Sequence, residues 1–515
     1  MSDFASHAAD SGVLAGLGAA SGNGRATDAV AHNKIDEVVL AHLAKAGIAP
    51  AGLSSDEVFL RRAYLDTIGT LPTAQEAAAF LASADPARRG ALIDQLLARN
   101  EFPVYWAMKW SDLLRIKAEF PINLWPTAAQ EYYSWLCESL KKNKPYDQFA
   151  RELLTSSGSN FRVGPVNFYR AVQNREPQSL AQAVALTFMG VRMEKWPAAR
   201  RAEMAVFYSQ VGYKPTGEWK EEIVFYDRSK PLATDNVVFP DGTKTRLQAG
   251  RDPRTEFADW LIAPRNPYFT RNIANRVWAW LYGRGIIDEP DDIRPDNPPL
   301  YPDLLAYLEG ELVSSNYDLK HIHRLILNSN TYQRSSIPRR AKPETAKAFD
   351  SYPVRRLDAE VLIDALCQIT GTSEQYSSAV PEPYTIMPNG ERAIALPDGS
   401  ISSPFLELFG RSPRTSGMES ERNNRPTAAQ RLHLLNSSQI ERRIEQGPAL
   451  QEIFRKPDPR VLLTSLYLTI LSRYPTEEEA KTAAAYLHGS GLNRSQAAVD
   501  IAWALINSTE FVYRH

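Results

Sequence analysis

The chain has 515 residues, of which 43% are hydrophobic and 23% are charged, which is typical of a globular protein with an ample core. Its 59 Lys and Arg nearly balance its 60 Asp and Glu, so no overall field favours nucleic acid or an anionic membrane surface. No apolar run of about eighteen residues predicts a membrane-spanning helix. The length suggests two to four domains.

Cysteine is sparse. Cys137 and Cys367 are far apart, and the sequence contains neither C-x-x-C nor C-x-x-C-H. These absences exclude, on local grounds, a zinc knuckle, a thioredoxin-like pair and covalent haem attachment. We expect both thiols to be buried small apolar groups and not a disulfide.

Residues 1–32 are rich in Ala, Gly and Ser and lack periodicity, which predicts a disordered leader. Within them, residues 12–22 resemble a weak apolar signal segment. Asp3 and Asp10 precede that segment and no Lys or Arg does, which fails the usual signal pattern. The sequence therefore contains no convincing signal peptide, and a flexible leader is expected.

Residues 33–211 carry closely spaced helix signals and are predicted to form an N-terminal helical domain. Capping boxes at Ser54 with Glu57 and at Thr73 with Glu76 each precede a helix-periodic segment. Further helices are expected after Asp85-Pro86 and over residues 131–143, 146–158 and 179–191.

Helical periodicity gives way to short β-like runs over residues 212–253, which we predict to be a linker. Residues 221–227 (EEIVFYD) and 236–243 (NVVFPDGT) are short β-like runs separated by turn residues. Such a pattern predicts a small β-hairpin.

Residues 270–286 form the densest segment of the chain, with an apolar stripe that includes Ile273 and Val277. A helix that is apolar on most of its surface belongs in the core, so its Arg and Asn side chains must find partners inside or at the rim of that core. We therefore predict a structural signature that consists of Arg271, Asn275, Arg276, Trp278, Gly283 and Gly285.

Residues 254–515 are predicted to form a C-terminal helical domain, which makes the fold class mainly α: two helical domains joined by a small β-containing linker. Residues 372–426 are rich in Pro, Ser and Gly and hold little helical periodicity. A segment of that length without regular structure usually carries function or wraps a surface. Clear helices are expected over residues 254–263, 302–316, 319–333 and 355–371, and after a capping box at Thr427 with Gln430.

The segment 408–437, which contains the Arg-rich loop, is the strongest candidate for a binding site. Its guanidinium groups could converge on a carboxylate, sulfate or phosphate. Alternatively, they could pin the loop onto the carboxylate-bearing helix near residue 360. The first reading predicts a concave pocket and the second predicts fully paired guanidinium groups. The candidate residues are Arg411, Arg414, Arg422, Arg425, Arg356, Glu360 and Asp364.

Metal and cofactor signals are weak. The acidic stretch 288–298 lacks the D-x-D-x-D-G spacing of a calcium loop. His321 and His323 are two residues apart, so on a helix they cannot form an i, i+4 zinc pair. No Walker loop, G-x-S-x-G or H-E-x-x-H motif occurs. We expect no metal and no cofactor, and nothing in the sequence decides whether the protein is an enzyme.

Many ordered segments together resemble the planctomycete-type paired domains of unknown function, a family whose members are typically exported and often fused to a cytochrome-c-like module. The first domain is matched at residues 59–76, 106–117, 145–154 and 167–171, and the second at 257–286, 318–336, 355–366, 408–414, 425–437 and 504–511. The resemblance implies a periplasmic or exported location.

One departure from the family pattern concerns cysteine. In many relatives a C-x-x-C-H-like segment follows Gly-Val-Arg, whereas here Gly190-Val191-Arg192 continues directly into residues 193–196. A second Cys-bearing stretch, expected before the Glu-Arg of the Arg-rich loop, reads SGMESER over residues 416–422 and also lacks Cys. A haem, metal or disulfide that needs those sulfur atoms cannot form at these positions.

Three functional hypotheses follow. The first is a non-catalytic structural or interaction protein that has lost an ancestral cysteine site, with an unknown protein or an envelope polymer as its partner. The second is an enzyme or ligand-binding protein for an anionic or carbohydrate substrate at the Arg-rich loop. The third is a redox partner that binds a cytochrome without carrying haem.

Overall fold

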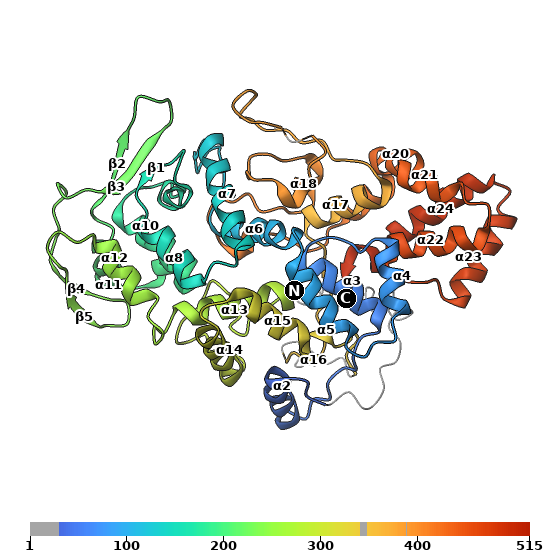
Figure 1. Ribbon diagram of the computed structural model, residues 1–515, viewed down its shortest axis with the longest axis horizontal. Coiled ribbons are helices and arrows are strands. Elements are labelled where there is room, and N and C mark those ends of the chain that lie inside the picture. The colour runs from blue at the N-terminus through green and yellow to red at the C-terminus, as the bar shows by residue number, and fades with distance from the viewer. Residues whose placement is uncertain (1–29, 340–347, 388) are drawn as a thin grey trace.

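The computed structural model describes residues 30–339, 348–387 and 389–515 and is mainly helical, as predicted (Figure 1). Residues 1–29 of the predicted leader lie outside the described residues. The N-terminal part contains α2 (Lys34–Lys45), α3 (Asp56–Thr67), α4 (Ala74–Ala82), α5 (Arg88–Ala98), α6 (Glu101–Leu113), α7 (Pro126–Lys141), α8 (Tyr146–Thr155), α9 (Asn167–Arg170), α10 (Pro177–Val184) and α11 (Ala198–Val206).

The C-terminal part is also helical and contains one short strand pair. Strand β6 (Arg355–Arg356) pairs antiparallel with β7 (Tyr513–Arg514), so the end of the chain returns to the start of α17. The helices are α12 (Pro253–Leu261), α13 (Phe269–Tyr282), α14 (Pro302–Ser314), α15 (Leu319–Asn328), α16 (Asn330–Gln333), α17 (Ala359–Thr370), α18 (Pro404–Leu408), α19 (Ala428–Asn436), α20 (Ser438–Gln446), α21 (Pro448–Phe454), α22 (Pro459–Leu471), α23 (Glu477–Gly489), α24 (Arg494–Ile506) and α25 (Thr509–Val512).

The region between these parts contains two small sheets instead of the single predicted hairpin. Strand β3 (Glu222–Tyr226) lies between β1 (Gly158–Ser159) and β2 (Val211–Pro215). The second run, β4 (Asn236–Val238), pairs with β5 (Lys244–Arg246). The Asp-Gly turn that follows β4 folds it onto the next residues of the chain, so the two predicted runs do not pair with each other.

Helix starts follow the capping signals closely. Thr73 and Thr427 form the predicted capping boxes at the starts of α4 and α19. At α3 the prediction was wrong by one residue, because Ser55, not Ser54, accepts the hydrogen bond of a first-turn amide. Ser54 is instead buried, and its backbone N–H donates to the carbonyl of Gln333 at 2.9 Å.

The two helical parts share one continuous hydrophobic core, whose side chains run from Ile35 to Tyr513. Helix α3 is the best example, because the C-terminal end of the chain lies beside it (Figure 1). Arg62 on α3 donates to the carbonyl oxygen of His515 at 2.8 Å and to that of Tyr332 at 2.7 Å. N-terminal and C-terminal residues therefore complete the same interior.

Cys137 and Cys367 are separate free thiols. Among the residues that the structure describes, no helix is both long enough and apolar enough to cross a membrane.

Candidate functional site

Arg422 in the Arg-rich loop lies near three carboxylates of the protein. Its guanidinium contacts Asp112 on α6 at 2.7 Å and Glu360 on α17 at 2.6 Å, and Asp358 lies 3.8 Å away. The side chain is 5% exposed. One cation from the loop therefore joins an N-terminal helix to a C-terminal helix.

Arg411 and Arg414 are also directed inward. Arg414 donates to Asp112 at 3.1 Å, and Arg411 lies 3.5 Å from Glu360. Both also donate to backbone carbonyl oxygens, Arg411 to that of Ile401 and Arg414 to that of Ile116. Their side chains are 4% and 1% exposed, so neither guanidinium faces the solvent.

The remaining candidates divide into buried and exposed groups. Arg356 donates to the carbonyl oxygens of Phe409 at 2.6 Å and Asn423 at 3.1 Å. Asp364 accepts from the backbone N–H of Ala393 at 2.6 Å and belongs to the same buried region. Arg425 is exposed, and its side chain makes no ion pair with the residues that the structure describes.

The pKa values of Glu360 and Asp364, the two carboxylates on α17, are shifted in opposite directions. Burial alone would raise the pKa of Glu360, but the charge and hydrogen bonds of Arg422 outweigh it and lower that pKa to about 2. Burial raises the pKa of Asp364 to about 6, against the weaker effect of Arg392. Burial and the neighbouring Arg414 lower the pKa of Arg411 to about 10. Strong ion pairing thus holds Glu360 charged, whereas burial dominates at Asp364.

Sequence reasoning missed the partners that complete this network. Lys109 on α6 contacts Asp358 at 3.0 Å, and Arg514 on β7 contacts Asp358 at 3.1 Å and Asp66 on α3 at 3.2 Å. A usable signal existed, because Lys109 and Asp112 stand among the aromatic residues of an otherwise buried helix. Charges at such positions almost always have partners.

Two of the predicted signature side chains on α13, Asn275 and Arg276, contact the segment that follows the helix. The amide of Asn275 donates to the carbonyl of Ile287 at 3.0 Å and accepts from its N–H at 2.8 Å. Arg276 contacts Asp291 at 2.6 Å and is 1% exposed. A Cβ atom on Gly285 would lie 2.0 Å from the carbonyl oxygen of Ile287, so this close approach requires glycine.

The other signature residues occupy the surface, the core and the end of the same helix. Arg271 contacts Glu309 at 3.1 Å and is 41% exposed. The Trp278 ring stacks on Tyr282 at 5.4 Å within the core. Gly283 ends the helix with φ +86°, a conformation that L side chains rarely adopt.

The acidic stretch 288–298 contacts both segments in which the resemblance expects cysteine. Asp292 pairs with Lys195 at 2.8 Å, and Asp291 accepts from the backbone N–H of Glu419 at 2.6 Å. The two segments also supply walls of one cavity of about 250 Å³, which is lined by Val191, Arg192, Glu194, Thr415, Ser416 and Met418. Two sequence-distant segments are therefore neighbours in space.

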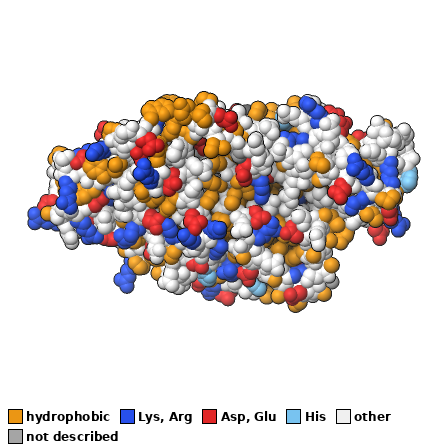
Figure 2. Space-filling model, turned by 45° about the horizontal axis from the view of Figure 1, so that its top comes forward, with side chains coloured by type: hydrophobic (Ala, Val, Ile, Leu, Met, Phe, Trp, Pro, Cys, Tyr) orange, Lys and Arg blue, Asp and Glu red, His pale blue; other side chains and the backbone are white. Residues whose placement is uncertain are grey.

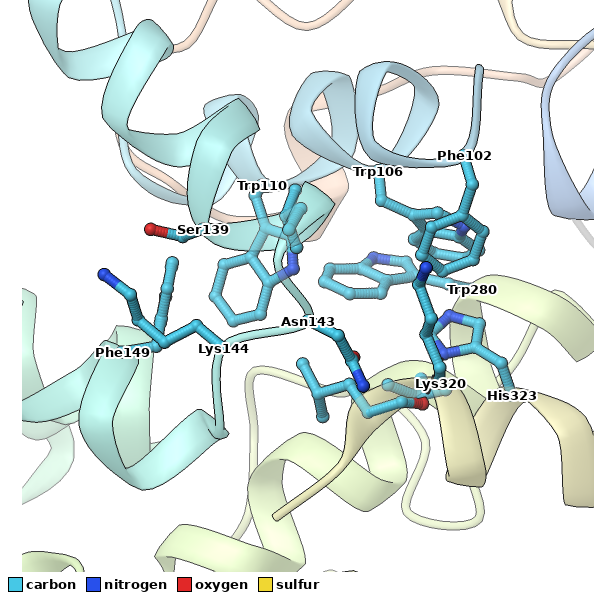
Figure 3. A pocket seen from close by; sticks show the side chains of 13 residues that line it. Phe102, Trp106, Trp110, Ser139, Asn143, Lys144, Phe149, Trp280, Lys320 and His323 are labelled. Carbon is cyan, nitrogen blue, oxygen red and sulfur yellow. Dashed lines mark hydrogen bonds between the residues drawn. The ribbon is translucent and has the colours of Figure 1, made fainter. Parts of the chain in front are cut away.

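A small aromatic cavity lies between α6, α13 and α15 (Figure 3). Its walls include Trp106, Trp110, Trp280 and His323, and its volume of about 20 Å³ suits a single water molecule. Burial lowers the pKa of His323 to about 4. A neutral imidazole in so small a space acts as part of the core.

Among residues 30–339, 348–387 and 389–515, no group of three or more His, Cys, Asp or Glu side chains is arranged to hold a metal ion. His321 instead pairs with Glu311 at 2.8 Å, and Asp291 and Asp292 pair with Arg276 and Lys195.

Comparison with known proteins identifies two domains. Residues 34–195 match the family described as "Protein of unknown function (DUF1549)", and residues 253–487 match "Protein of unknown function (DUF1553)". No curated protein and no solved structure matches the chain. The chain therefore contains the planctomycete-type paired domains of unknown function, DUF1549 followed by DUF1553.

Proposed function

We propose that this chain is a non-catalytic structural or interaction protein, whose two domains are locked into one rigid body. The observation that carries the proposal is the internal neutralisation of three of the four arginines in the Arg-rich loop. Arg411, Arg414 and Arg422 are each 5% exposed or less and are directed at carboxylates of the protein itself. An anion-binding site needs cations that remain open to the ligand.

The loss of an ancestral cysteine site is the second part of the proposal. Its support is that the segments 191–194 and 415–418 both contribute side chains to the wall of one cavity and that neither segment contains cysteine. Ion pairs between Lys195 and Asp292 and between Arg192 and Glu289 now hold the first segment. The family resemblance supports a periplasmic or exported location, where the partner is a protein or an envelope polymer.

Hydrogen exchange along residues 411–423 tests the role of the loop. Many of its amides are bonded: Arg411 N–H donates to Leu406 and Asn423 N–H donates to Gly410, both at 3.0 Å. We expect protection close to that of α17, because loops that bind ligands are drawn from the least stable parts of a protein. The exposed residues 248–250 serve as a fast-exchanging comparison.

The same measurement is repeated with sulfate, phosphate and oligogalacturonate. The proposal predicts no change in the exchange of residues 411–423. Rapid exchange that slows when one of these anions is added would contradict it and favour an anion-binding site.

A further inference from the structure

The cleft between α7 and the segments 383–386 and 391–401 has the dimensions of a ligand site. It measures about 740 Å³, within the range of small-molecule pockets. One wall comes from the DUF1549 part and the other from the DUF1553 part. The site therefore exists only when the two domains are joined.

An aromatic cluster forms the rim of this cleft. Trp125 at the start of α7 lies 4.6 Å from the Trp219 ring and 5.3 Å from the Tyr384 ring, between centroids. Trp219 is 61% exposed and Tyr384 is 51% exposed. Hydrophobic side chains also gather along the upper edge of the face in Figure 2, in the region of α7 and the loop beside it. Large aromatic rings left this open mark a binding surface.

The cleft also carries hydrogen-bonding groups that the protein does not use. Asp398 accepts from the backbone N–H of Ala118 through Oδ1, while its Oδ2 is buried and finds no partner among the described residues. The hydroxyl of Thr385, which is 2% exposed, is unpartnered in the same sense. Glu131 and Glu391 line the cleft at half-buried and exposed positions. Buried polar atoms of this kind usually have a partner.

The charge of the lining narrows the ligand class. Glu131, Glu391 and Asp398 contribute three carboxylates, and no Lys or Arg is among the described residues that line the cleft. One cation, Lys220, lies at the rim, where its ammonium is 5.5 Å from the centroid of the Trp219 ring. Single-stranded nucleic acids also stack on aromatic rings, but they require a positively charged groove. Sulfated and uronic polymers are disfavoured for the same reason.

Pyranose rings without acidic groups fit both features. A pyranose has an apolar C–H face that stacks on Trp or Tyr, whose rings are flat and rigid. Its hydroxyl groups donate to carboxylates in charge-assisted hydrogen bonds. Three aromatic rings at one rim and three carboxylates in the cleft suit several consecutive sugar units.

The cleft walls are fixed in place by backbone contacts. Gly399 N–H donates to the carbonyl of Ile116 at 2.9 Å, and Glu119 N–H donates to the Ser400 hydroxyl at 2.9 Å. Arg411 and Arg414 donate to the carbonyls of Asp398 and Pro397. The Arg-rich loop therefore holds the cleft wall at Pro397 and Asp398, although Arg411 and Arg414 do not themselves line the cleft.

We propose that this cleft binds an oligosaccharide segment of an uncharged polysaccharide. The inference rests on the proposed function, since it names the partner class of that interaction protein. Tyr384 and Trp219 stack on the sugar rings, and Glu391 accepts hydrogen bonds from their hydroxyl groups.

Isothermal titration of the full-length protein with cellohexaose, xylohexaose, mannohexaose and chitohexaose tests this inference. We expect saturable binding of at least one hexasaccharide. Tyr384→Ala and Trp219→Ala should each weaken it by about tenfold, and Glu391→Gln should weaken it less. Trp503→Ala is the matched control, because Trp503 is 37% exposed on α24, at the opposite end of the molecule from β2 and β3.

Absence of saturable binding to all four hexasaccharides would overturn the inference. So would equal loss in the Trp503→Ala variant, tighter binding of oligogalacturonate, or binding of a basic proline-rich peptide in place of the sugars. Chromatography of the incubated hexasaccharides separates the two proposals. Binding without shortening supports both, and binding with shortening keeps the cleft assignment but contradicts the non-catalytic function.

Discussion

The buried ionic network around Arg422 and the open cleft beside Tyr384 use similar residue types for opposite purposes. In the network, Asp112 and Glu360 meet guanidinium groups within 2.7 Å. In the cleft, Oδ2 of Asp398 has no partner among the described residues, and the rings of Trp219 and Tyr384 are more than half exposed. The two regions meet at Pro397 and Asp398, which line the cleft and whose carbonyl oxygens accept hydrogen bonds from Arg414 and Arg411.

This difference shows that density of charge is a poor guide to a binding site. The Arg-rich loop is the more conspicuous feature in the sequence, yet three of its four arginines, Arg411, Arg414 and Arg422, are paired with carboxylates inside the fold. A group signals a ligand only when the protein leaves it accessible and unsatisfied. Substitutions in the network should therefore change the free energy of unfolding or its pH dependence, whereas truncation of an exposed ring at the cleft should change it little.

Replacing Arg422 by Met should have the largest effect. The change leaves the buried Glu360 and Asp358 and the half-buried Asp112 without their shared cation, which we expect to lower the free energy of unfolding by about 3–5 kcal/mol. Urea denaturation measures it. Arg425→Met is the matched control and should stay within about 0.5 kcal/mol, because Arg425 is exposed. Equal, small changes in the free energy of unfolding of both variants would contradict a stabilising role for the ionic network.

Replacing Asp364 by Asn should change the pH dependence of stability. The folded-state pKa of Asp364 is raised to about 6 from an ordinary value of 3.8, so its protonated form favours folding below pH 3.8 and this contribution is lost as the pH rises through 6. A shift of that size corresponds to about 3 kcal/mol. Relative to wild type, the Asn variant should gain stability between pH 4 and pH 7.

Urea unfolding at pH 4, 5, 6 and 7 checks this comparison. Glu360→Gln is the opposite case, because the pKa of Glu360 is lowered to about 2 and its contribution is already complete above pH 4.5. A parallel pH dependence in wild type and the Asp364 variant would contradict the assignment.

Truncating Tyr384 to Ala should have the smallest effect on folding. Its ring is 51% exposed, so the free energy of unfolding should change by no more than about 0.5 kcal/mol. Thermal unfolding measures it. A loss of several kcal/mol would mean that the aromatic rim is part of the core and not a binding surface.

Much of the fold was predictable because its signals are local. Thr73 with Glu76 and Thr427 with Gln430 form capping boxes within four residues, and Gly283 ends α13 at the expected position. The shift from Ser54 to Ser55 has a non-local cause, since Ser54 is held by Gln333. Local patterns give helices, and distant contacts adjust their ends.

The site was less predictable because its partners are distant in sequence. Arg422 and Asp112 are 310 residues apart, and the cleft rim combines Trp125, Trp219 and Tyr384 from three separate segments. Spacing within one helix identified the Glu360–Asp364 face but not which cations reach it. No periodicity indicated the cleft.

Native-state hydrogen exchange along a urea series tests most directly whether the network joins the two domains into one cooperative unit. We predict that the most protected amides of α3 and α6, from the DUF1549 part, open with the same free energy and urea dependence as those of α17, from the DUF1553 part. Opening of α3 and α6 at clearly lower urea, while α17 stays protected, would contradict the account.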